Sequence, residues 1–409
     1  MKLPPQYILH VGTIKITCLK LVQGLDGIRK VAAFSTRQAD GFDRGVVKDL
    51  SKASDTLRET VQYVSDRANE SIIRARVVVS HPHLKNFIFG SSLYFYGNPH
   101  ALTIKDVREV IAQTRSVATI PLNEMIIQAV PQEFLVNDLS GISNPIGLEA
   151  TRLGVTLRLF TMDYTICNNL LRALERADID ATEFIPISLA ASRAVLTQEE
   201  KEDGVILVDM GGYSTRMDCY KNSILVTSNV IPKGSEWITE TLAQKLNLKL
   251  EHARRLKEMF VSAQQKPQFS EELIPVTDPD GKENQHITRK RLEEESLAVI
   301  RELAMQITFA IRKIGEEFAP ITQAVFTGGG AKLDGFLDLA QEMIPYGLRL
   351  GIPRNTPGLP SALTDATHAD VVGAIGYSSL VVDPNYSPPV SNAFVRVVDS
   401  AKHWVGEYF

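Results

Sequence analysis

One local pattern occurs three times in this chain: a run of apolar residues, typical of a buried strand, that leads directly into a glycine-containing turn. It is found at residues 7–12, 205–212 and 324–330, which read YILHVG, VILVDMGG and AVFTGGG. After each of the first two turns a second strand-like segment follows. This repetition indicates two related halves that face each other, each built around a strand, a glycine turn and a further strand.

The segments around the first turn predict alternating strands and helices, which places the chain in the α/β class. Residues 7–22 are rich in β-branched side chains on both sides of the Gly12-Thr13 turn, and residues 28–34 resume the apolar pattern. Residues 46–68 carry apolar side chains at helical spacing, and residues 75–80 then read as a buried strand.

From residue 81 to about residue 160 the pattern changes, and we interpret this stretch as an inserted subdomain. Strand-like segments at residues 93–96 and 133–136 surround one helix, which Thr103 would cap. A helix at residues 164–177 and a short strand near Phe184 then return to the α/β pattern.

Three later segments differ in character. Residues 264–285 are polar and contain Asp280-Gly281, so we expect an exposed loop. Residues 288–318 predict a long amphipathic helix. Residues 383–392 hold three prolines without regular periodicity and read as a linker.

Composition excludes several classes of protein. The 409 residues are 44% hydrophobic and 22% charged, as in an ordinary globular protein, and the net charge of -4 argues against a nucleic-acid partner. Cys18, Cys167 and Cys219 are odd in number and far apart, which fits neither a disulfide framework nor a cysteine zinc site and favours a reducing cytoplasm. The sequence has no apolar run of membrane-spanning length and no signal-peptide pattern, so we expect a chain that neither spans a membrane nor is exported.

Glycine turns after strands suit phosphate binding, because without a Cβ their backbone N–H groups can surround phosphate oxygens. One such turn is weak support, since turns after strands also use glycine for purely structural reasons. Three of them in one chain, each directly after an apolar strand, favour a nucleotide-binding protein.

At the level of motifs the chain resembles the actin-like ATPases and, among them, the FtsA family of bacterial cell-division proteins. Residues 326–336, FTGGGAKLDGF, look like the family's adenosine loop and form the strongest single match. Residues 208–215, VDMGGYST, look like its second phosphate loop, and residues 9–15, LHVGTIK, stand where the first belongs. Further similar segments extend the resemblance over about residues 7–409; they are residues 130–136, 144–148, 194–197 and 230–234.

This resemblance implies an actin-like (actin/Hsp70 ATPase-type) α/β fold of two lobes around a nucleotide cleft. The first lobe (1A) would comprise residues 1–82 and 161–204, with an FtsA-type inserted subdomain (1C) at 83–160. The second lobe (2A) would comprise residues 205–232 and 306–382, with a smaller subdomain (2B) at 233–305. A linker at 383–392 would lead to a C-terminal amphipathic helix at 393–409.

The resemblance also implies ATP or ADP as the ligand, with Mg²⁺ as an accompanying ion that Asp209 would hold. The expected nucleotide contacts stand in the three loops and in the segments that follow the second: Gly12, Thr13, Lys15, Asp209, Gly211, Gly212, Ser214, Thr215, Gly234, Lys257, Gly328, Gly329, Gly330 and Lys332.

Two departures from the family pattern bear on hydrolysis. His10 stands where the first loop normally carries an acid that helps to hold the metal's water shell, and Mg²⁺ prefers oxygen ligands. Ile187 stands where relatives have the Glu or Gln that orients the attacking water, unless the alignment is off there by a residue or two. Since phosphoryl transfer depends on positioning and charge stabilisation, these losses would slow it on the order of 10²-fold or more. We expect no catalytic residue and weak or absent ATPase activity.

Three further departures bear on binding. Tyr213 stands where a third glycine is usual, and one interpretation is that it crowds the phosphate pocket and abolishes binding. Arg216 replaces an acid and either contacts a phosphate or is an exposed loop arginine. Arg254 replaces a glutamate that contacts the ribose, whereas Lys257 is retained and either contacts the nucleoside or lies on a solvated helix face.

The last segment predicts an amphipathic helix that Asn392 would cap. One face, an arc of roughly 140° at 100° per residue, collects Phe394, Val397, Val398, Ala401, Trp404, Val405, Tyr408 and Phe409. Either this face docks on the protein core or, as its aromatic residues, the preceding linker and the resemblance favour, it lies on a membrane. Because the acidic and basic residues of the helix balance, binding would depend on apolar area and on avidity within a polymer.

Three functions fit these observations. The first is a structural adaptor that forms filaments of itself on the cytoplasmic face of the membrane at the division site and tethers the tubulin homologue FtsZ there. The resemblance implies that residues 233–305 receive the FtsZ tail and that downstream division proteins also bind. The second is an active ATPase whose turnover drives filament dynamics. The third is another actin-like membrane scaffold, such as a PilM-type pilus assembly protein; the C-terminal helix favours the first.

Overall fold

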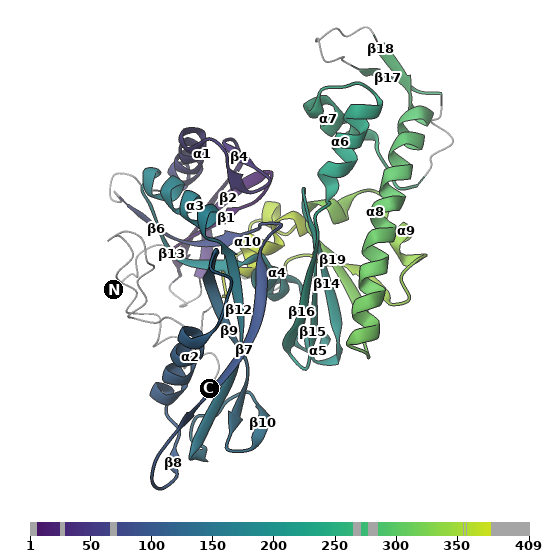
Figure 1. The fold of residues 1–409 in the computed structure, drawn as a ribbon. Helices are drawn as coiled ribbons and strands as arrows, with labels where there is room; N and C mark the ends of the chain where they lie inside the picture. Colours follow the sequence, from purple (N-terminus) through teal and green to yellow (C-terminus); the bar gives the residue numbers. More distant parts are fainter. Residues whose placement is uncertain are drawn as a thin grey trace. The chain divides into compact units, whose positions relative to one another are not determined.

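The chain folds into two compact units. The computed structural model describes residues 6–24, 29–65, 72–264, 271–276, 285–354, 356 and 358–377 (Figure 1). One unit comprises Met1–Ile187 with Ile375–Phe409, and the other comprises Ser188–Ala374. Within the described ranges, no helix has the length and apolar character that a membrane crossing requires.

The first unit is built on a five-stranded mixed sheet. Its strand order is β13 (Ile179–Pro186), β6 (Ile73–Val79), β1 (Gln6–Val11), β2 (Lys15–Gln23) and β3 (Arg29–Gln38). β1 runs parallel to β6 and antiparallel to β2. Apolar stripes of α1 (Leu50–Gln62) and α3 (Tyr164–Arg176) pack on this sheet, and the short strands β4 (Phe42–Asp43) and β5 (Val46–Val47) precede α1.

A second sheet in this unit confirms the predicted insert of strands around one helix. Its order is β10 (Leu139–Ile142), β9 (Glu124–Val136), β12 (Arg152–Asp163) and β7 (Lys85–Tyr94), with β8 (His100–Ala101) and β11 (Glu149–Ala150) paired beside it. The helix α2 (Ile104–Val117) buries Val107, Val110 and Ile111 in the same apolar cluster as β12. As predicted, Thr103 caps α2, in a capping box with Asp106.

The second unit repeats the sheet of the first. Its order is β16 (Ile224–Ile231), β15 (Thr215–Lys221), β14 (Val205–Met210), β19 (Gln323–Thr327) and β20 (Gly347–Leu350). The long helix α8 (Arg289–Glu317) lies along this sheet (Figure 1), and its buried stripe shares one core with β14 and β15. The other helices are α4 (Ile187–Val195), α5 (Gln198–Asp203), α6 (Ser235–Lys245), α7 (Leu250–Phe260), α9 (Phe336–Gln341) and α10 (Ala369–Gly373).

The two sheets share order, strand direction and turn geometry, which confirms the predicted pair of related halves. In both, the first three strands run antiparallel to one another in sequence order, and the fourth strand to join the sheet runs parallel to the first. The Gly12 N–H donates to the Lys15 carbonyl at 3.1 Å, and the Gly211 N–H donates to the Ser214 carbonyl at 2.9 Å. The glycine turns therefore occupy the same place in each half.

The predicted exposed loop at residues 264–285 was partly wrong. β17 (Leu273–Val276) pairs antiparallel with β18 (Gln285–Thr288) to form a hairpin before α8. Ile274 and Val276 point into the core of the second unit, whereas Leu273 is exposed. This alternation is a strand signal, but the polar residues around it concealed it. The predicted linker at 383–392 and the helix at 393–409 lie outside the described residues.

Candidate functional site

The second unit brings the turn after β14 against the start of α6. The N–H groups of Ser235 and Glu236, the first two residues of α6, donate to the carbonyls of Gly211 and Gly212 at 3.0 and 2.8 Å. A Cβ on Gly234 would stand 2.4 and 2.5 Å from those same two carbonyl oxygens, so only glycine fits here. The N–H groups of Ser235 and Glu236 already have hydrogen-bond acceptors and are not available to an anion. A phosphate bound here would therefore take its hydrogen bonds from the turn after β14 and from the loop after β19.

The loop after β19 lies directly against the end of β14. A Cβ on Gly328, whose φ is +85°, would stand 2.4 Å from Oδ1 of Asp209. A Cβ on Gly330 would stand 3.0 Å from Cβ of Met210, and one on Gly329 would stand 3.4 Å from Cγ2 of Thr367. The structure thus places the predicted residues Asp209, Gly211, Gly212, Gly234 and Gly328–Gly330 in one cluster within the second unit.

Lys332, a predicted nucleotide contact, forms an ion pair with Asp365. Partial burial opposes ionisation of this carboxyl, but hydrogen bonds from Lys332 and Thr367 lower the pKa of Asp365 to about 2. The Lys332 side chain remains 47% exposed. The pair fixes the loop after β19 against the segment that precedes α10.

Lys257 lies in a buried ion network, so its interpretation as a solvated helix residue is wrong. Its Nζ donates to Oε1 of Glu236 at 3.0 Å and to the Ser235 carbonyl at 3.1 Å. Arg254 binds the other oxygen of Glu236 through Nη2 at 2.7 Å and Nε at 3.1 Å. Burial opposes the charge of Glu236, but Arg254 and Lys257 lower the pKa of its carboxyl below the ordinary value.

Glu236 is the residue at this site that sequence reasoning missed. It is 1% exposed, and it joins the start of α6 to α7 through both basic residues. Its position directly after Gly234-Ser235 was a possible signal, since an acid in the first turn of a helix suits the helix dipole. The spacing of Arg254 and Lys257 places both on one face of α7, which completes the pattern.

Thr215 and Ser214 continue the turn into β15. The Thr215 hydroxyl, which is fully buried, donates to the Lys233 carbonyl at 2.9 Å and so holds β15 against the chain that leads into α6. Ser214 is half-buried, and its carbonyl closes the turn.

Arg216 is neither exposed nor in a loop, which corrects one of its two interpretations. It lies on β15 directly opposite Asp209, it is 4% exposed, and it bonds Oγ of Ser228 at 3.3 Å. Burial lowers the pKa of Arg216, and the charges of Asp218 and Asp209 oppose this change. A buried cation therefore faces the predicted metal-binding carboxylate.

In the first unit, the glycine turn packs on His10. A Cβ on Gly12 would stand 2.6 Å from the Lys15 carbonyl oxygen and 3.0 Å from Cε1 of His10. Thr13 lies beside Gly45, and Lys15 begins β2. Gly12, Thr13 and Lys15 therefore share one turn of the first unit.

Ile187 is the first residue of α4 and is 5% exposed. It follows Pro186, which pairs with Val79 at the end of β13. The eight residues predicted to bind membrane lie outside the described residues.

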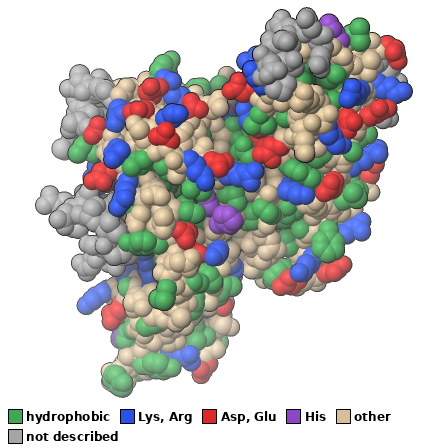
Figure 2. Space-filling view, turned by 45° about the horizontal axis from the view of Figure 1, so that its top comes forward, with side chains coloured by type: hydrophobic (Ala, Val, Ile, Leu, Met, Phe, Trp, Pro, Cys, Tyr) green, Lys and Arg blue, Asp and Glu red, His purple; other side chains and the backbone are tan. Residues whose placement is uncertain are grey.

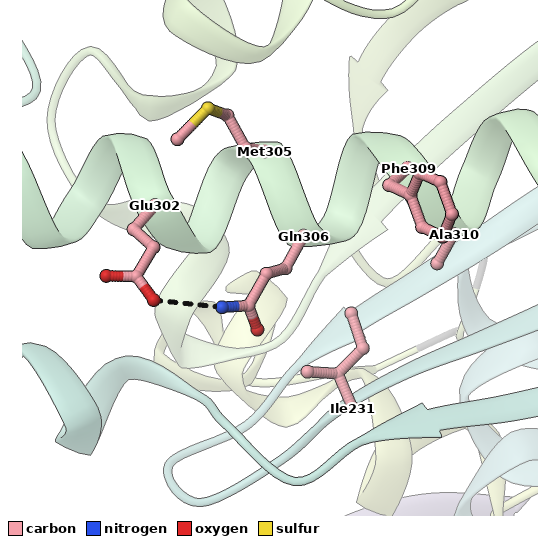
Figure 3. A pocket seen from close by; sticks show the side chains of 6 residues that line it. All are labelled: Ile231, Glu302, Met305, Gln306, Phe309 and Ala310. Atoms are coloured by element: carbon pink, nitrogen blue, oxygen red, sulfur yellow. Dashed lines mark hydrogen bonds between the residues drawn. The ribbon is translucent and has the colours of Figure 1, made fainter.

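A shallow apolar groove lies on the second unit between α8 and β16 (Figure 3). It has a volume of about 380 Å³ and is lined by Ile231, Glu302, Met305, Gln306, Phe309 and Ala310. Met305 and Phe309 are 55% and 74% exposed, although both are large and apolar. On the face in Figure 2, acidic and basic side chains are interspersed, and apolar side chains lie between them.

Two matching sheets with equivalent glycine turns define the class of fold, which is actin-like. The fold is similar to that of a chain in the solved PilM-PilN type IV pilus biogenesis complex, with a TM-score of 0.62 and 14% identity over 90% of this chain and 97% of that one. It is also similar to MreB5 of Spiroplasma citri bound to ADP, with a TM-score of 0.53 and 12% identity over 91% and 95% of the chains.

Sequence comparisons point to one family of proteins with this fold. The model for "Cell division protein FtsA" matches residues 206–376, and the model for the SHS2 domain inserted in FtsA matches residues 95–161. FtsA of Pseudomonas aeruginosa is 24% identical over 97% of this chain and 96% of its own length. FtsA of Escherichia coli K12 is 25% identical over 90% and 89%. The chain is therefore similar to FtsA cell-division proteins over nearly its full length.

Proposed function

We propose that this protein polymerises on the cytoplasmic face of the membrane at the division site and tethers FtsZ to it. In this proposal a bound nucleotide acts as a structural or switching ligand and is hydrolysed slowly or not at all. The observation that carries it is the match to FtsA proteins over nearly their full length, together with an actin-like fold whose glycine turns are intact in both halves. The division into subdomains 1A, 1C, 2A and 2B is part of the same proposal.

The nucleotide would be ATP or ADP, as in the related MreB5 structures with ADP and AMPPNP. The glycine turns would approach its phosphates, and the loop at Gly328–Gly330 would approach its adenosine. Hydrolysis is expected to be weak, because His10 and Ile187 supply neither a carboxylate nor a water-orienting amide. Phosphate release should stay near the background rate with or without vesicles; sustained turnover would favour the active-ATPase alternative.

The C-terminal segment at 393–409 would bind the membrane through its apolar face. Full-length protein should co-sediment with vesicles of phosphatidylethanolamine and phosphatidylglycerol, and a chain truncated after residue 392 should stay in the supernatant. A Trp404→Ala variant should bind more weakly, whereas His403→Ala, on the opposite face, serves as the matched control. Unchanged binding by the truncated chain would contradict the anchor and favour a PilM-type scaffold.

Partner binding is proposed for the smaller subdomain of the second unit, and the groove on α8 adjoins it. The groove exposes Met305 and Phe309 beside the carboxylate of Glu302, which suits an amphipathic peptide such as the FtsZ tail. Met305→Ala should weaken binding of FtsZ from the same organism by roughly tenfold. Met259→Ala is the control, because Met259 is 70% exposed on α7 and does not line the groove. Equal affinities for the two variants would place the tail elsewhere.

Filaments are the remaining part of the proposal. Among solved structures of similar fold is a double helical filament of MamK, with a TM-score of 0.50. Electron microscopy of the protein on lipid monolayers should show filaments, and their absence with and without nucleotide would leave a monomeric tether.

A further inference from the structure

One lysine of the second unit is half-buried and lacks a carboxylate partner. Lys201 belongs to α5, a surface helix in which no residue is fully buried. Over the residues that the structure describes, its Nζ forms no ion pair and no hydrogen bond. The acids beside it are engaged elsewhere: Glu200 accepts from Arg349 at 2.7 and 2.8 Å, and Glu202 accepts from Gln198 at 3.1 Å.

The Lys201 amine lies over an aromatic ring and near a second cation. Its Nζ stands 5.3 Å from the centre of the Tyr220 ring, which is close to the limit of about 6 Å for a cation–π contact. The ring is held in place, because Tyr220 is 4% exposed and its hydroxyl donates to the Ser188 carbonyl at 3.2 Å. Arg193, an exposed residue of α4, supplies the charge that acts on the amine. These surroundings disfavour the protonated form of the amine.

The protonation state of Lys201 follows from these surroundings. Burial is the larger cause and the charge of Arg193 the smaller, and together they lower the pKa of Lys201 from 10.5 to about 8. At pH 7.5 about a quarter of this amine is then neutral, against about one in a thousand for an ordinary lysine. Because intrinsic nucleophilicity falls with the pKa, as it does for thiols, the net gain in reactivity is roughly tenfold.

We infer that Lys201 is a site of acylation and that its donors are small acyl phosphates. The neutral amine attacks the carbonyl carbon of the donor. A C–N bond forms, the C–O bond to the phosphate breaks, and the phosphate leaves with the proton that the amine gives up. The exposed guanidinium of Arg193 attracts the anionic donor to this part of the surface. The product is an uncharged amide, so acylation removes the repulsion between the two cations.

The acylation site is independent of the proposed function, because none of its residues belongs to the glycine turns, the groove or the C-terminal segment. Limited acetylation of the full-length protein with acetyl phosphate at pH 7.5, followed by peptide mass spectrometry, tests it. Lys201 should react about tenfold faster than Lys249, an exposed lysine of the same unit. The rate at Lys201 should level off above about pH 8, while the rate at Lys249 should keep rising.

An Arg193→Gln variant tests the attraction of the donor, and thermal melting verifies that it folds. Its Lys201 should react more slowly with acetyl phosphate and be slowed less with N-acetoxysuccinimide, since this uncharged donor gains nothing from the guanidinium. Equal slowing with both donors would overturn the role given to Arg193. A wild-type Lys201 that reacts no faster than Lys249, or whose rate shows no plateau up to pH 10, would overturn the inference and leave the proposed function intact.

Discussion

A single buried carboxylate, Glu236, joins the first turn of α6 to two basic residues of α7. Its side chain is 2% exposed, against 9% for Lys257 and 22% for Arg254. Removing one member of such a network costs far more than removing a surface ion pair, because the remaining charges stay buried without a partner.

Glu236→Gln should therefore lower the free energy of unfolding by about 3 kcal/mol. Urea denaturation at neutral pH measures this loss. Glu295→Gln is the matched control, because Glu295 pairs with Lys245 at 2.8 Å with both side chains more than a third exposed. That pair should contribute less than about 1 kcal/mol. Similar losses in the two variants would contradict the buried network.

The same network predicts a pH dependence. Because the pKa of Glu236 is lowered in the folded protein, the unfolded chain binds more protons between the folded pKa and its ordinary value of 4.5. The stabilisation is therefore complete above 4.5 and is lost as the pH falls through the folded pKa. Urea midpoints measured on the acid side should fall less steeply with pH in Glu236→Gln than in the wild-type protein.

Gly234 is one of the glycines of the cluster whose replacement should disturb the turn. Gly234→Ala would place a methyl group 2.4 Å from a backbone carbonyl oxygen, which requires the turn or α6 to move. We expect a loss of about 2 kcal/mol in the free energy of unfolding, measured by urea denaturation. Gly347→Ala, whose added Cβ meets no atom within 4 Å, should change stability by less than about 0.5 kcal/mol.

Helices and strands could be predicted where the sequence of the segment itself carries apolar periodicity or a cap residue. The strands at both glycine turns, the capped helix α2 and the long helix α8 all follow from apolar periodicity and cap residues within a short window. The hairpin β17–β18 was missed because its alternation is short and its flanks are polar. Glu236 was missed because its partners are distant in the sequence, and the environment of Arg216 was misread because strand pairing, not local pattern, buries it.

The contribution of the cap residue to the stability of α2 can be tested by substitution. Thr103→Ala removes the hydroxyl that accepts from the Asp106 N–H, so the first turn should fray, at a cost of about 1 kcal/mol. Hydrogen exchange of the amides at residues 104–108 should accelerate. Ser116→Ala, at the other end of α2, should leave these amides unchanged, and equal protection in both variants would contradict the cap.

For the whole molecule, the three cysteines report on the integrity of the fold. All are buried; burial raises the pKa of Cys167 and Cys219 to about 12, and raises that of Cys18 as well. Since the thiolate is the reactive form, Ellman's reagent should react with none of them rapidly in native protein and with all three in guanidinium chloride. A rapidly titrating thiol in the native state would contradict this packing.

The repeated sheet has a consequence for the history of the molecule. Two halves with one strand order and one turn geometry are what duplication of an ancestral gene segment would leave behind. After such a duplication the side chains of each copy can change while its sheet is kept. This is because the hydrogen bonds between strands constrain the backbone more than they constrain the side chain at any one position. His10 and Asp209 occupy equivalent positions of the two sheets, so the same architecture accepts an imidazole at this position in one half and a carboxylate in the other.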